Sequence, residues 1–172
     1  MDFLLNTYQE DLIVDYEAEK LFGYHERPGV LRRLTPPWVN AEVLREPENL
    51  QAGSCAVIRL KKFGIKLNRE ARHTKYNKNR FFKDVQIKGP FRFWQHSYYF
   101  KNISASSSKL TDFVEYELPL SGLLDIAVGR SVRKELERMF HYRHSVIKND
   151  LSIIDKYEVP VKKFLFPAQA ES

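Results

Sequence analysis

The chain has 172 residues and a net charge of +6, with 43% hydrophobic and 29% charged residues, which favours one globular domain. Its seven glycines argue against glycine-rich phosphate loops, and its single cysteine, Cys55, excludes an internal disulfide. No uncharged apolar run approaches the roughly 20 residues that cross a bilayer, and with no signal-peptide pattern at the start of the chain we expect a cytoplasmic protein.

Periodicity predicts a series of strands followed by one long helix. The predicted elements are a strand at 3–14, short helices at 17–24 and 30–34, strands at 38–45, 55–62, 65–76, 81–88, 91–103 and 110–118, and a helix from Ser121 to about Lys148. Consecutive antiparallel hairpins with one amphipathic helix predict an α+β fold, in which the helix lies against one face of the sheet. We therefore expect a domain at 1–148 and a less regular C-terminal extension at 149–172.

Ionisable groups occupy the apolar register of three predicted strands, where side chains alternate between the two faces. The shared parities are Asp112 with Leu110, Val114, Tyr116 and Leu118, His96 with Trp94, Tyr98 and Phe100, and Asp84 and Gln86 with Phe82. A mostly apolar face with a few ionisable groups is typical of a ligand cavity. A packed core rarely contains such groups unless they are paired. The pattern therefore predicts a binding chamber.

The long helix has a cation inside its apolar stripe. The stripe consists of Val132, Leu136, Met139, Phe140 and Ile147. Arg143 lies about 20° from its centre on a helical wheel, and His144 lies at its edge. We expect an ion pair between Arg143 and Asp112 or Asp84, with His96 nearby. Such a pair can fix helix register without contacting a ligand, and Arg143 can instead extend to the sheet edge or bond the helix C-terminus.

His96 and Asp112 are the candidate catalytic pair, because a neutral imidazole in a pocket can act as a general base. A buried histidine bonded to a neighbour is the commoner arrangement, so the spacing leaves catalysis open. His25 either lines the pocket mouth or closes the turn that follows it. The one compact metal-ligand spacing is His141-x-x-His144, and because His141 points away from the stripe we predict no metal and no cofactor.

The positive charge is concentrated in residues 59–83, which contain ten Lys or Arg and one acid, Glu70. Lys61, Lys62 and Lys66 could bind nucleic acid, anionic lipid headgroups or an acidic partner. Exposed strand faces and hairpin turns also carry Lys and Arg to protect sheet edges, and we favour this interpretation. Cys55 has no convincing base or cation nearby in the sequence, so we predict a buried structural thiol.

Several local motifs resemble one branch of the START/polyketide-cyclase (SRPBCC) superfamily over about residues 3–148. These motifs are His25-Glu26-Arg27-Pro28-Gly29, Leu34-Thr35-Pro36-Pro37-Trp38, Asp84-Val85-Gln86 with Gly89-Pro90-Phe91, Trp94-Gln95-His96, Thr111-Asp112-Phe113-Val114-Glu115-Tyr116 and Phe140-His141-Tyr142-Arg143-His144. Some members of this branch are free-standing, and others continue into a nucleotide-sugar-epimerase-like domain. This chain differs in its more basic 59–83 segment and in a tail without the glycine-rich turn. We therefore expect no dinucleotide site, and a free-standing protein or a remnant of a fused one.

The resemblance implies a helix-grip fold, in which a curved sheet of six to seven strands wraps around a long C-terminal helix. It also implies a cavity for a small hydrophobic or amphipathic ligand. The expected ligand-binding residues are Trp38, Phe82, Asp84, Gln86, Trp94, His96, Tyr98, Asp112, Tyr116, Leu136, Phe140 and Arg143. The alternatives are a cyclase- or dehydrase-like enzyme that uses this cavity without a metal, and an interaction module that uses the basic strands. A fold by itself does not choose among these functions.

Overall fold

A single antiparallel sheet of seven strands forms the framework of the protein. The computed structural model describes residues 5–62, 64–119 and 123–157. The strands are β1 (Asn6–Val14), β2 (Ala41–Arg45), β3 (Cys55–Lys62), β4 (Ile65–Asn77), β5 (Phe81–Lys88), β6 (Phe93–Asn102) and β7 (Ser108–Glu117). Their order across the sheet is β1-β7-β6-β5-β4-β3-β2, so β2 to β7 form consecutive hairpins and β1 pairs with β7.

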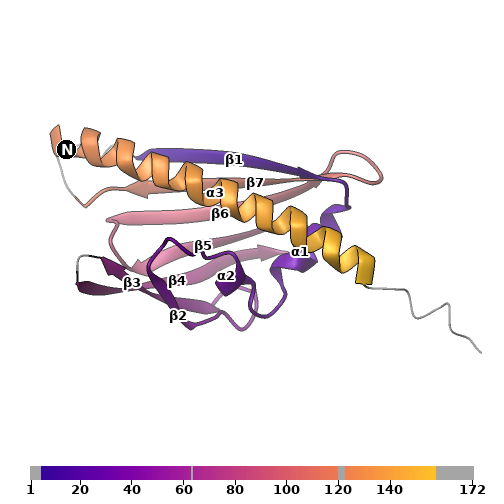
Figure 1. The fold of residues 1–172 in the computed structure, drawn as a ribbon, viewed down its shortest axis with the longest axis horizontal. Helices are drawn as coiled ribbons and strands as arrows, with labels where there is room; N and C mark the ends of the chain where they lie inside the picture. The colour runs from indigo at the N-terminus through magenta and orange to yellow at the C-terminus, as the bar shows by residue number, and fades with distance from the viewer. Residues whose placement is uncertain (1–4, 63, 120–122, 158–172) are drawn as a thin grey trace, which may run out of the picture.

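Three helices cover one face of this sheet. Two are short, α1 (Ala18–His25) and α2 (Val30–Arg33), and the third, α3, runs from Leu123 to Tyr157. Figure 1 shows α3 crossing the sheet diagonally, with α1 beside the C-terminal part of α3. At 1.5 Å per residue its 35 residues extend about 52 Å, which is longer than any strand. The predicted α+β helix-grip fold is confirmed.

The two-residue period of the strands decides which side chains face the helices. In β7, Leu110, Asp112, Val114 and Tyr116 are buried, while the residues between them are only partly covered. The β4 strand departs from this period, because its pairing with β5 shifts register between His73 and Lys75. A bulge adds one residue to a strand and reverses the parity beyond it. His73 and Tyr76 consequently both face the core, although they are three residues apart.

The core consists of two apolar clusters under α3. One lies toward α1 and contains Phe22, Phe82, Phe100, Leu110 and Ile147 among its buried residues. The other contains Tyr8, Trp94, Val114, Tyr116, Leu118, Leu136 and Phe140. Phe140 is 1% exposed and stacks on Tyr8 with ring centroids 5.4 Å apart. The second cluster therefore fills the space between α3 and that end of the sheet.

Several boundaries differ from the sequence-based predictions. The most informative difference is that α3 continues to Tyr157 instead of ending near Lys148, because Leu151 is buried and Ile154 packs against the first cluster. The strand predicted from Trp38 begins at Ala41, because Pro36 and Pro37 precede it and the chain turns at 37–39. The predicted N-cap at Ser121 and the segment 158–172 lie outside the described residues. Within the described ranges, no helix has the length and apolar character needed to cross a membrane.

Candidate functional site

A cavity of about 360 Å³ lies between the first apolar cluster, α2 and the loop that precedes β3. Its lining residues are His25, Glu26, Arg27, Pro28, Val30, Leu31, Leu34, Glu46, Pro47, Glu48, Asn49, Leu50, His73, Phe82, Tyr98, Asp112, Arg143 and Ile147. The inner wall is mostly apolar, whereas Glu26, Arg27 and Glu48 at the rim are exposed. An apolar interior with a few inward polar groups is typical of small-molecule sites.

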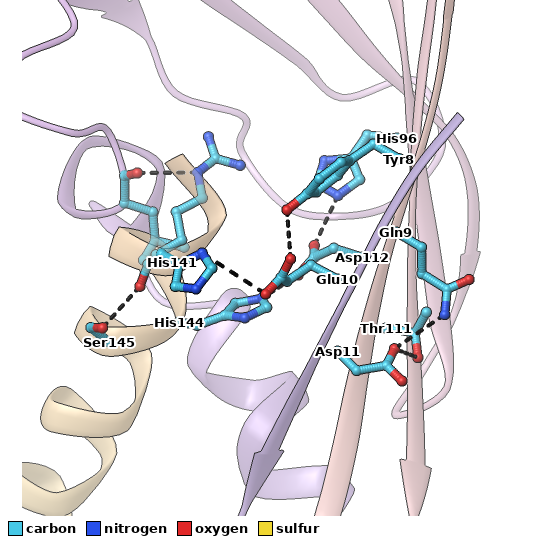
Figure 2. A network of polar contacts seen from close by, with 12 residues as sticks. Tyr8, Gln9, Glu10, Asp11, His96, Thr111, Asp112, His141, His144 and Ser145 are labelled. Atoms are coloured by element: carbon cyan, nitrogen blue, oxygen red, sulfur yellow. Dashed lines mark hydrogen bonds and ion pairs between the residues drawn. The ribbon is translucent and has the colours of Figure 1, made fainter. Parts of the chain in front are cut away.

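Asp112 stands at the inner wall between two imidazoles. His96 from β6 contacts one carboxylate oxygen through Nε2 at 2.8 Å, and His144 from α3 contacts the other, also at 2.8 Å (Figure 2). All three side chains are buried. Burial acts to raise the pKa of Asp112, but the hydrogen bonds from His144 and His96 outweigh it and hold this pKa below its usual range. Asp112 is therefore ionised at pH 7, and its hydrogen bond with His144 links α3 to the sheet.

The predicted ion pair of Arg143 with Asp112 or Asp84 is wrong. The Nε–H of Arg143 donates to the carbonyl of Leu34 at 3.2 Å, and His144 occupies the place beside Asp112. The guanidinium carbon also lies 5.6 Å from the centre of the Phe140 ring. Arg143 thus joins α3 to the end of α2 and lines the cavity without a carboxylate partner in the described residues.

Two further imidazoles line the cavity with defined orientations. The Nδ1 of His25 lies 2.9 Å from the carbonyl of Leu21, and the Nδ1 of His73 lies 2.9 Å from the carbonyl of Leu50. Since a carbonyl oxygen only accepts, Nδ1 carries a proton in both rings, and a ring of this kind that is neutral has an acceptor lone pair at Nε2. Burial lowers the pKa of His25 to about 4, which keeps this ring neutral at pH 7.

Tyr98 lies between two rings of the inner face. The centroid of its ring is 4.0 Å from that of Phe82, on which it stacks, and 3.8 Å from that of His96. Burial raises its pKa well above the ordinary value, and nearby Asp84 acts in the same direction, so the phenol remains protonated. Asp84 also attracts the guanidinium of Arg69. The Nε of Arg69 is buried without a hydrogen-bond partner, and its guanidinium carbon lies 4.9 Å from the centre of the Trp94 ring.

Four of the twelve expected ligand-binding residues line the cavity: Phe82, Tyr98, Asp112 and Arg143. His96 and Asp84 are buried behind this wall, and Gln86 donates its amide to the carbonyl of Phe91. Trp94, Tyr116, Leu136 and Phe140 belong to the second apolar cluster. Trp38 is 36% exposed between Tyr142 and Arg138, away from the cavity lining. Of the five expected polar residues, the structure thus brings Asp112 and Arg143 to the cavity, and it packs most of the expected apolar residues in the second cluster.

Helix α2 is attached to both sides of the cavity. The backbone N–H of Gly29, at its start, donates to Glu46 at 2.7 Å. Arg33, at its end, binds both carboxylate oxygens of Asp150 on α3 at 3.0 and 2.8 Å. The hydrogen bond from Arg33 lowers the pKa of Asp150, so this carboxylate is ionised at pH 7. These contacts hold α2 as a wall of the cavity.

The basic segment does not form a uniform cationic surface. Lys61 and Arg59 lie 3.2 and 3.7 Å from Glu42, and Arg69 faces the core. Cys55 is half-buried, not buried as predicted, because its thiol lies at a strand start and contacts the carbonyl of Gly53 and the guanidinium of Arg72. In the described part of the chain, no three His, Cys, Asp or Glu side chains are grouped as ligands for a metal ion.

The seven-stranded sheet, the long helix and the cavity beside it define a helix-grip protein with an internal cavity. Residues 14–142 match the family described as "Polyketide cyclase / dehydrase and lipid transport", and the chain belongs to this family. No curated protein matches the chain.

Solved structures with the same fold come from proteins of different activity. A nucleoside-diphosphate sugar epimerase from Corynebacterium glutamicum is 23% identical, with a TM-score of 0.68, and the match covers 87% of this chain and 30% of the epimerase. The Zhui aromatase/cyclase from Streptomyces sp. R1128 is 10% identical, with a TM-score of 0.69 and coverage of 88% and 96%. Norcoclaurine synthase from Thalictrum flavum is 10% identical, with a TM-score of 0.68 and coverage of 90% and 99%. At these identities the likeness establishes the fold alone.

Sequence reasoning gave no role to three residues that shape this site. The helical wheel puts His144 at the edge of the apolar stripe, and from there it contacts Asp112. Arg69 is one of the ten basic residues of the 59–83 segment, and it shares a parity with buried His73. That parity was a usable signal, since Leu67, Arg69, Ala71 and His73 alternate along one strand. The hydrogen bond of His73 to the carbonyl of Leu50 could not be predicted, because Leu50 lies in an irregular loop without helical or strand periodicity.

Proposed function

We propose that this protein binds a small hydrophobic or amphipathic molecule in the cavity beside α2. The observation that carries the proposal is an interior space of about 360 Å³ with walls that include Leu31, Leu34, Leu50 and Phe82. Membership of a family that includes cyclases, dehydrases and lipid transport supports hydrophobic ligand binding or a cyclase-like role. A cytoplasmic location fits a chain with a single, unpaired cysteine.

A pair of leucine variants tests this proposal. Leu31→Trp places an indole in the cavity, whereas Leu44→Trp puts the same group on β2, where Leu44 is exposed and does not line the cavity. Fluorescence of the neutral dye N-phenyl-1-naphthylamine should rise in wild type and in Leu44→Trp, and should remain near the free-dye level in Leu31→Trp. Equal dye binding by both variants, with both folded by circular dichroism, would show that the cavity is not the binding site.

A second candidate function is acid–base catalysis in the same cavity. The specific observation is that Asp112 lines the cavity and is bonded to His96 and His144, as a carboxylate that orients an imidazole base would be. The test is turnover of a short poly-β-ketone surrogate by wild type, His96→Gln and Asp112→Asn. Lost turnover with retained dye binding would support an enzyme, and no turnover by wild type on such surrogates would favour a binding protein.

A further inference from the structure

The charged groups in and behind the cavity wall differ in how many of their polar atoms have a partner. Asp112 is bonded to two imidazoles, and Asp84 lies close enough to Arg69 to interact electrostatically. Arg143 has only its Nε–H engaged, by the carbonyl of Leu34. In the described residues neither of its terminal nitrogens has a hydrogen bond or an ion pair. A half-buried guanidinium with free donors on a cavity wall is suited to bind an anion.

An acceptor lies near this donor. His25 is 7% exposed and lines the cavity, and its Nε2 has no hydrogen-bond partner in the described part of the chain. Arg143 and Asp112 line the same cavity as His25. Because Nδ1–H is bound to Leu21, the neutral ring can only accept at Nε2. A hydroxyl group on a ligand would satisfy this atom.

We propose that the ligand is a hydroxylated amphipathic monocarboxylate, whose carboxylate is bound by Arg143 and whose hydroxyl donates to Nε2 of His25. This inference rests on the proposed function, since it names the class of molecule that the cavity accepts. The apolar body of the ligand lies against Phe82, Leu50 and Ile147.

A carboxylate fits better than a phosphate. One guanidinium balances one negative charge, and the buried carboxylate of Asp112 lies on the same cavity wall. The rim adds Glu26 and Glu48, although their exposure means that solvent and salt screen them. The lining as a whole has four acids, Glu26, Glu46, Glu48 and Asp112, against two cations, Arg27 and Arg143, so the second charge of a dianionic phosphate would add to an excess of negative charge.

The experiment compares two-ring aromatic compounds that differ by one group. The reference compound is 6-hydroxy-2-naphthoic acid. Its methyl ester lacks the charge, and 2-naphthoic acid lacks the hydroxyl. 2-Naphthyl phosphate differs from 2-naphthoic acid in the anionic group and is compared with that compound. Affinities are measured at pH 7 by displacement of N-phenyl-1-naphthylamine and by calorimetry. For wild type we expect 6-hydroxy-2-naphthoic acid to bind about tenfold or more tighter than its ester, because charged hydrogen bonds contribute this much. We expect 2-naphthoic acid to bind tighter than 2-naphthyl phosphate.

Three variants assign the preference to residues. Arg143→Met should reduce the acid-to-ester ratio to about one, because it keeps the length of the side chain and removes its charge. Arg138→Met is the matched control, since Arg138 is exposed on the same helix and does not line the cavity. His25→Phe keeps an aromatic ring beside Phe82 and should abolish the preference for 6-hydroxy-2-naphthoic acid over 2-naphthoic acid.

The outcomes separate this inference from the proposed function. Wild-type binding of acid and ester with equal affinity, or an unchanged preference in Arg143→Met, overturns the inference while cavity binding stands. Tighter binding of 2-naphthyl phosphate than of 2-naphthoic acid also overturns it. If neither the dye nor any of these compounds binds, both the inference and the proposed function fail. Thermal melts of each variant establish that it folds, and Arg143→Lys, which keeps the charge, should retain part of the preference if Arg143→Met is unstable.

Discussion

Replacing Asp112 with alanine should destabilise the protein more than any other single carboxylate truncation in the described sheet. The change removes two buried hydrogen bonds of 2.8 Å and leaves the Nε2–H groups of His96 and His144 without an acceptor. Hydrogen bonds to a charged group contribute about 1.5–3 kcal/mol each. We therefore expect the free energy of unfolding to fall by about 3–5 kcal/mol, a large share of the total for a domain.

Urea unfolding at pH 7, followed by circular dichroism, measures this loss. Asp11→Ala is the matched control, because Asp11 lies on the neighbouring strand and bonds Thr111 at the exposed face (Figure 2). Asp11 also bonds Lys109. Exposed pairs contribute about 0–1 kcal/mol, so this variant should remain near wild type. Equal losses for Asp112→Ala and Asp11→Ala would contradict the role given to burial.

Double-mutant cycles then assign the partner of Asp112. The cycle with His144→Ala should give a coupling energy of about 1–3 kcal/mol, because the two side chains share a buried hydrogen bond. The cycle with Arg143→Ala should give a smaller value, since Arg143 bonds the carbonyl of Leu34 instead. A larger coupling to Arg143 than to His144 would refute the arrangement in the structure and restore the ion pair predicted from the sequence.

Three more predictions concern pH, packing and backbone. The folded-state pKa of Asp112 is below its unfolded value of about 3.9, so the stability that this carboxylate contributes is complete above that pH and is lost as the pH falls through the folded value. Between pH 5 and pH 3, wild type should therefore lose more unfolding free energy than Asp112→Asn in urea titrations. Equal losses would contradict this. Phe140→Ala should cost about 3–5 kcal/mol by the same assay, against under about 0.5 kcal/mol for exposed Ile153→Ala. Gly29→Ala should lower the unfolding free energy by about 1 kcal/mol because φ is +84°, whereas Gly23→Ala inside α1 should raise it slightly, and changes of the same sign would contradict the backbone argument.

Strand periodicity was sufficient to predict which polar groups face the helices. Alternation alone predicts that Asp112, His96 and Tyr98 share the face of the apolar residues, and the structure has all three on the side of the sheet that faces the helices. The alternation fails in β4, where the bulge between His73 and Lys75 brings Tyr76 back to the core. A bulge depends on pairing with a neighbouring strand, so a single strand's pattern does not reveal it.

The partner of Asp112 could not be predicted, because a helical wheel gives direction around the helix and not depth over the sheet. Arg143 and His144 both point toward the sheet, but His144 lies opposite Asp112 and Arg143 lies opposite the end of α2. The position of the cavity was also beyond the sequence. Its far wall is the segment from Glu46 to Leu50, which has neither helical nor strand periodicity.

The attachment of α2 also has a consequence for how quickly a bound molecule would leave. Arg33 and Asp150 do not line the cavity, yet their bidentate contact holds a helix that forms one of its walls. If a ligand passes by displacement of α2, we expect a weaker contact to speed its entry and its escape together and to leave the ratio of the two rates, the dissociation constant, nearly unchanged. The residence time would then depend on residues that never touch the occupant.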